Sequence, residues 1–165
     1  MKNVALNTLK YTGIVTLSQY VGNKKVEIAR VDNAGTNILF EFFSDCLLGY
    51  FDFARKNRPT KIMLLQYDID KKAYINKSGY ITYTNVEKVY NESEGIVRYS
   101  FTVTRDILEG NTFDSIGLYA NSTKINDYEN YAAIVKLTED EITNQSLVAS
   151  TALIVDWELH ISNKA

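Results

Sequence analysis

The C-terminal segment 149–162 constrains the fold most, because its side chains alternate with a period of two from Leu153 onward. Such a period places successive side chains on opposite faces of a β-strand. One apolar face and one charged face are typical of an antiparallel sheet with one solvated face. We therefore predict that the core is built against Trp157, the only tryptophan. The apolar set is Leu153, Val155, Trp157, Leu159 and Ile161, and the other set is Ile154, Asp156, Glu158 and His160.

Similar strand patterns, separated by polar turns, recur through the rest of the chain. Segments 9–21 and 24–31 flank Gly22 and Asn23, a pair that favours a β-hairpin with a tight turn. About eight short strands predict a mainly β fold, an antiparallel β-sandwich or jelly-roll-like arrangement, in a single domain over residues 1–165. The further expected strands are 61–67, 80–86, 96–104, 113–120 and 131–137, with one helical turn at 105–110 and a polar loop at 121–130.

One amphipathic helix is expected after the first hairpin, from Thr36 to Gly49. Thr36 can cap its start, and Gly49 stands where helices commonly end. The apolar stripe between them packs either on the core or on a partner, and the core is the favoured alternative. Cys46 lies in this stripe, so we expect a buried small hydrophobe rather than a nucleophile. An aromatic loop with Tyr50, Phe51 and Phe53 follows the helix.

The composition argues against several classes of site. The chain has 18 basic and 20 acidic residues and a net charge of −2, so no basic excess favours nucleic-acid binding. A single cysteine excludes an intrachain disulfide, and a single histidine excludes metal sites that need several. No stretch approaches the roughly 20 apolar residues of a membrane-spanning helix, and no signal sequence is visible after Met1, so we expect synthesis in a cytoplasm. No phosphate-loop, dinucleotide or zinc-protease motif occurs, and we expect no cofactor and no metal.

The acids and the histidine of the last strand are the main candidates for chemistry. Asp156, Glu158 and His160 share one face of the strand, where they could form an acid–base or metal site. The favoured alternative is an ordinary half-exposed sheet face, because such a face has this alternation. Asp114 is another candidate carboxylate for glycoside hydrolysis, but no spacing singles it out. We predict that the protein is not an enzyme.

Residues 113–162 resemble β-sandwich modules of bacteriophage tail, baseplate and fibre-attachment proteins. The resemblance rests on Ser115-Ile-Gly-Leu-Tyr-Ala120, a polar loop, Tyr131-Ala-Ala-Ile-Val-Lys-Leu137 and the alternating last strand with its tryptophan. It implies a virion structural subunit of the neck or tail, acting as an adaptor, ring, collar or fibre-anchoring protein. The first half of the chain is similar to small virion proteins of AT-rich tailed phages, including crAss-like phages. Partners would be further copies of the chain and other neck or tail proteins, with no nucleic acid and no membrane.

The aromatic residues suggest where such contacts form. The chain has 12 tyrosines, and tyrosine is enriched at protein interfaces. A second hypothesis is a carbohydrate- or receptor-binding module, since jelly rolls and aromatic loops suit sugars. In that case Tyr50, Phe51, Tyr128 and Tyr131 would contact the sugar. A third hypothesis is an enzyme that uses Glu158 and His160 as its acid–base pair. The interface residues expected under the first hypothesis are Tyr50, Phe51, Phe53, Tyr128 and Tyr131.

Overall fold

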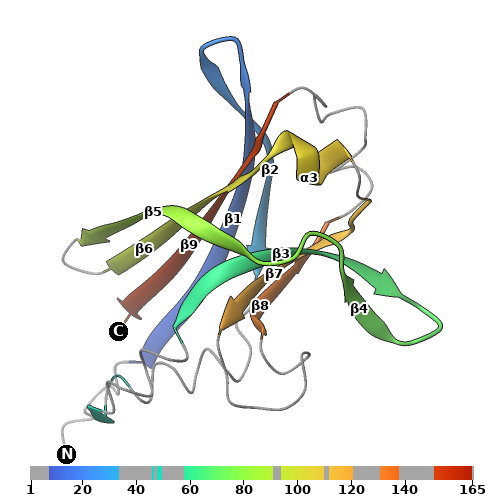
Figure 1. The fold of residues 1–165 in the computed structure, drawn as a ribbon. Helices are drawn as coiled ribbons and strands as arrows, with labels where there is room; N and C mark the ends of the chain where they lie inside the picture. Colours follow the sequence, from blue (N-terminus) through green and yellow to red (C-terminus); the bar gives the residue numbers. More distant parts are fainter. Residues whose placement is uncertain are drawn as a thin grey trace, which may run out of the picture.

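The described part of the chain is built almost entirely from antiparallel strands, as the sequence predicts (Figure 1). A computed structural model describes residues 8–33, 46, 48–49, 58–90, 94–109, 112–120, 131–137 and 151–164. Its elements are β1 (Thr8–Val21), β2 (Lys24–Asn33), β3 (Pro59–Asp68), β4 (Ala73–Asn76), β5 (Ile81–Tyr90), β6 (Glu94–Val103), α3 (Arg105–Glu109), β7 (Ser115–Ala120), β8 (Tyr131–Lys136) and β9 (Leu153–Lys164).

The strands form one continuous sheet that has two halves. The order is β2-β1-β9-β6-β5-β3-β7-β8, and β4 pairs with β3 beside this path. β5 joins the halves, because Ile81 and Thr82 pair with β3 whereas the segment from Tyr83 onward pairs with β6. We call β2-β1-β9-β6-β5 the five-stranded half and β4, β3, β7 and β8 the second half. Buried residues from both halves belong to one apolar cluster, so the sheet folds over a shared core.

β9 lies at the centre of the five-stranded half, between β1 and β6. Trp157 is fully buried, opposite Val15 of β1 and Tyr99 of β6. Leu153, Val155 and Leu159 enter the same core. The prediction that the alternating C-terminal segment is a strand packed on the core through Trp157 is therefore confirmed. Burial of a large aromatic side chain is among the strongest single contributions to a core.

The first hairpin is also confirmed. β1 and β2 pair from Gly13 opposite Asn33 to Val21 opposite Lys24, which leaves Gly22 and Asn23 as the turn. Gly22 has φ +62°, a value that glycine reaches without a steric penalty and that suits the first central position of a tight hairpin turn.

The sequence does not predict the short strand β4, because four residues are too few to establish an alternating pattern. Its pairing with β3 forms a second hairpin around residues 69–72. The carboxylate of Asp68 accepts hydrogen bonds from the amides of Asp70 and Lys71, each at 3.0 Å, and so fixes the turn. The helical turn predicted at 105–110 is confirmed as α3.

Most of the helix predicted from Thr36 to Gly49 lies outside the described residues. Cys46 and Leu48 are helical, and Gly49 has φ +77°, which fits the predicted helix end. The prediction that Cys46 is buried is wrong, because its side chain is exposed. Cys46 and Leu48 are both exposed in the last turn. The helical spacing of the apolar residues therefore does not bury the Cys46 side chain at this end of the stripe. The predicted loop 121–130 also lies outside the described residues, and no described helix is long and apolar enough to cross a membrane.

Candidate functional site

A groove of about 420 Å³ lies on the face of the five-stranded half that points away from the core. All five strands of this half contribute to it, and every side chain that lines it is charged or carries a hydroxyl. We call this pocket the groove. It is lined by Thr16, Ser18, Lys25, Glu27, Arg30, Glu87, Arg98, Ser100, Asp156 and Glu158.

The strand register brings these side chains together from distant parts of the chain. Thr16 lies opposite both Arg30 and Asp156, and Asp156 lies opposite Ser100. In the next row, Glu158 lies opposite Arg98, which in turn lies opposite Glu87. Directly opposed side chains on one face of an antiparallel pair are within contact distance. Two adjacent rows of cross-strand neighbours therefore form the centre of the groove, and Ser18, which lies opposite Glu27, belongs to a third row.

Two β-bulges adjust which side chains face the groove. Ala29 pairs with Leu17 but Glu27 pairs with Ser18, so Ile28 is an extra residue in β2. Because of this shift, Glu27 and Arg30 both line the groove, while Ile28 and Ala29 contact the core.

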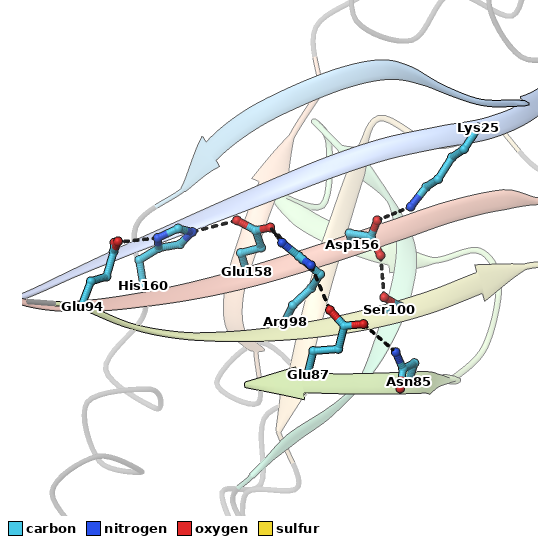
Figure 2. A network of polar contacts seen from close by, with 9 residues as sticks. All are labelled: Lys25, Asn85, Glu87, Glu94, Arg98, Ser100, Asp156, Glu158 and His160. Carbon is cyan, nitrogen blue, oxygen red and sulfur yellow. Dashed lines mark hydrogen bonds and ion pairs between the residues drawn. The ribbon is translucent and has the colours of Figure 1, made fainter. Parts of the chain in front are cut away.

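The second bulge is in β5, where Thr84 is the extra residue between Tyr83 and Asn85. The hydroxyl of Thr84 donates a hydrogen bond to the carbonyl of Ser100 at 3.0 Å. Tyr83 consequently packs against the core, and Asn85 and Glu87 join the polar side (Figure 2). A bulge re-aims side chains in this way at the cost of one unpaired residue.

Asp156 is the centre of the first polar cluster. Its carboxylate accepts a hydrogen bond from the Ser100 hydroxyl at 2.6 Å and forms an ion pair with Lys25 Nζ at 2.6 Å (Figure 2). Only 9% of the Asp156 surface is exposed. Lys25 comes from the strand beyond β1, so its side chain crosses β1 to reach the acid. A buried carboxylate needs such partners, because an unpaired charge is costly to remove from water.

Glu158 and Arg98 form the second cluster. Arg98 donates from Nε to Glu158 Oε1 at 2.8 Å and contacts the same oxygen through Nη2 at 2.6 Å, while Nη1 reaches Glu87 at 2.9 Å. The hydrogen bond with Glu158 raises the pKa of Arg98. Burial by itself would raise the pKa of Glu158, but the hydrogen bonds with His160 and Arg98 prevail and lower it. Glu158 is thus held as a carboxylate.

His160 extends this cluster toward the end of β9. Its Nδ1 lies 2.8 Å from Glu94 Oε1, and its Nε2 lies 2.8 Å from Glu158 Oε2 (Figure 2). Burial lowers the pKa of His160, but the hydrogen bonds with Glu94 and Glu158 outweigh it, so the pKa is raised overall. A protonated imidazole donates from both nitrogens and fits between two carboxylates. The arrangement suits a cation that joins β6 to β9 better than a base that accepts a proton.

The predicted clustering on the last strand is right in one part and wrong in another. His160 and Glu158 are in contact, whereas Asp156 pairs with Lys25 and Ser100 instead. The expectation of a half-exposed face is wrong for the acids, because Asp156 and Glu158 are each only 9% exposed. Cross-strand cations cover them. Arg98 and Ser100 alternate with core residues along β6, so this pattern in the sequence is enough to place them on the polar face. The parts that Lys25, Glu87 and Glu94 play in the site follow only from the strand order.

The other predicted site residues do not meet at this groove. Asp114 accepts hydrogen bonds from the Tyr67 amide at 3.1 Å and the Ser115 hydroxyl at 2.8 Å, so it connects β3 to the start of β7. Tyr131 begins β8, opposite Tyr119. Tyr50, Phe51, Phe53 and Tyr128 lie outside the described residues. Within the described ranges, no group of three or more His, Cys, Asp or Glu side chains is arranged to hold a metal ion.

No protein-family model matches the sequence, and comparisons with curated proteins and with solved structures found no match either.

Proposed function

We propose that the protein is a non-enzymatic structural subunit that assembles in several copies in the neck or tail of a tailed bacteriophage. The observation that carries the proposal is a pair of β-hairpins, β1–β2 and β3–β4, whose tips project from the body in different directions (Figure 1). Both tips expose large apolar side chains, which structural subunits use to contact their neighbours. The assignment to a phage particle rests on the resemblance of residues 113–162.

The β3–β4 hairpin is suited to a contact arm. Ile69 at its turn is 79% exposed, and Tyr67 and Ile75 on its two strands are 37% and 38% exposed. The rings of Tyr67 and Tyr74 meet edge to face at 5.1 Å, and Asp68 fixes the turn. An arm that is ordered before binding loses less conformational entropy when a partner covers it.

The β1–β2 hairpin has the same character. Tyr20, Val21 and Val26 near its tip are 47%, 59% and 39% exposed. β2 is also at the end of the strand order, and in the described residues its outer edge has no hydrogen-bonded strand, although part of β2 lies close to β8 at the other end of the order. Such an edge favours the addition of a strand from another chain. We assign a neighbouring copy of this chain as the occupant, because two arms that point in different directions can connect successive copies of one subunit.

The oligomeric state of the full chain tests the proposal. We expect native mass spectrometry and light scattering to give a mass of several copies for the wild type. The double variant Val21→Asp with Ile69→Asp places a charge in each tip contact and is expected to shift the population to monomer. Val89→Asp is the control, because Val89 is also exposed, at 46%, but lies on β5, away from both tips. A wild type that stays monomeric at all accessible concentrations would overturn the assembly.

The placement in a particle has its own test. Proteomics of purified particles of the phage whose genome encodes the chain should detect the protein at a fixed copy number per particle. Its absence from purified particles would overturn the virion assignment, whatever the oligomeric state of the isolated chain.

A further inference from the structure

We infer that the groove of the five-stranded half binds a neutral saccharide of one or two units through charged and hydroxyl side chains. This site goes beyond assembly, and it differs from the aromatic residues that the sequence suggested for sugars. The volume of about 420 Å³ falls in the range of roughly 300–1,000 Å³ that is typical of small-molecule sites. The ligand class follows from the hydrogen-bonding groups that remain available in the groove.

The floor of the groove presents two ordered carboxylates. Asp156 uses one oxygen for Ser100 and the other for Lys25, and Glu158 uses one oxygen for Arg98 and the other for His160. A carboxylate has about four acceptor positions, so each acid can still accept a hydrogen bond from a ligand. Both acids are already desolvated and held in place, and their reorganisation cost on binding is therefore small.

The same groove also supplies donors. Arg98 has five N–H groups and Lys25 has three, more than their contacts with Glu158, Glu87 and Asp156 require. The hydroxyl groups of Thr16, Ser18 and Ser100 lie in the same lining. A sugar hydroxyl both donates and accepts, so it can bond to a carboxylate and to a neighbouring cation at once. It can do so without separating the ion pairs that are already present.

The charge balance favours a neutral ligand. Lys25, Arg30 and Arg98 are the cations of the lining, and Glu27, Glu87, Asp156 and Glu158 are its acids, so three positive and four negative charges leave −1. A phosphate group would be repelled by this surplus of acid. A zwitterion would have to replace existing partners, because Lys25–Asp156 and Arg98–Glu158 are already paired at 2.6 Å. A neutral polyhydroxyl ligand is not repelled by the acids, and it does not have to replace an existing ion-pair partner.

Saturation-transfer difference NMR on the full-length protein tests the site, because it reports on the protons of the sugar at any size of assembly. Maltose, lactose and N-acetylglucosamine serve as probes. We expect saturable transfer with at least one of them, and a dissociation constant near the millimolar range, since the lining contains no aromatic ring. Lys25→Gln and Ser100→Ala should each weaken binding about tenfold, the usual effect of removing one hydrogen bond to a charged group.

Lys24→Gln is the matched control, because it makes the same change on the neighbouring residue, which does not line the groove. It should bind like the wild type. No saturable transfer with any of the three sugars, or equal affinities of Lys25→Gln and Lys24→Gln, would overturn the inference. If glycine or inorganic phosphate binds more tightly than the three sugars, and this binding is lost in Lys25→Gln, the assignment to a neutral saccharide is overturned. Ser100 lies on β6, away from both hairpin tips, so Ser100→Ala should lose affinity for the sugar and keep the oligomer mass of the wild type. The two proposals can therefore fail separately.

Discussion

β9 and β3 are the central strands of the two halves, and they differ in the kinds of side chain that they bury. The inward face of β9 is apolar, and its other face has acids that are buried almost as deeply. β3 is apolar on both faces: Ile62 and Leu64 enter the main core, while Met63 and Leu65 belong to a second cluster. Tyr74, Tyr119 and Ile134 cover that second cluster.

The difference shows that burial alone does not select apolar residues. The acids of β9 are tolerated because Arg98 and Ser100 stand directly opposite them on β6 and supply hydrogen bonds. Among the described residues, the strand neighbours of β3 place no comparable set of cations opposite its outer buried side chains: Leu65 faces Ser115 on β7, and Met63 faces Gly117. Apolar residues are the remaining way to fill that space without unpaired charges.

Alanine substitutions at Leu64 and Leu65 sharpen this comparison most, because the two residues are adjacent and both fully buried on opposite faces of β3. We expect each substitution to lower the free energy of unfolding by about 2–5 kcal/mol, the cost of a large-to-small change in a core. Urea unfolding followed by tryptophan fluorescence measures the loss. Ile75→Ala, at a position that is 38% exposed, is the control and should cost about 1 kcal/mol or less. A small cost for Leu65 beside a large one for Leu64 would mean that only one face of β3 supports the fold.

The two strands also show what the sequence can and cannot reveal. The apolar run 62–65 predicts a buried strand, and the alternation from Leu153 predicts which face of β9 meets the core; both are correct. The burial of Asp156 and Glu158 could not be read from β9. It depends on Lys25 and Arg98, which are 131 and 60 residues away in the chain. Strand order and the two bulges decide that these side chains meet, and neither leaves a local pattern.

Glu158→Gln tests whether the charged face of β9 is held by its cross-strand partners. The change keeps the shape of the side chain but removes the charge that pairs with Arg98 and His160. We expect a loss of about 1–3 kcal/mol in the free energy of unfolding at neutral pH, the usual effect of losing hydrogen bonds to a charged group. Glu87→Gln is the matched control. Its side chain is 50% exposed, so the same change should cost no more than about 1 kcal/mol. Equal costs at the two positions would contradict a special role for the buried acid.

The pH dependence of stability gives the smallest expected effect and concerns His160. Its pKa in the folded protein is raised above the ordinary value of 6.5, so its ion pairs with Glu94 and Glu158 stabilise the fold fully below that value. This contribution disappears as the pH rises through the folded-state pKa. We expect His160→Gln to cost up to about 1 kcal/mol at mildly acidic pH, where the lowered pKa of Glu158 keeps that acid ionised, and less at alkaline pH. Urea unfolding of both proteins across this range measures the difference. Since His160 is the only histidine, no other imidazole contributes. A difference that grows with rising pH would show that the ring is held neutral, and that the charged face of β9 relies on Arg98, Lys25 and Ser100 instead.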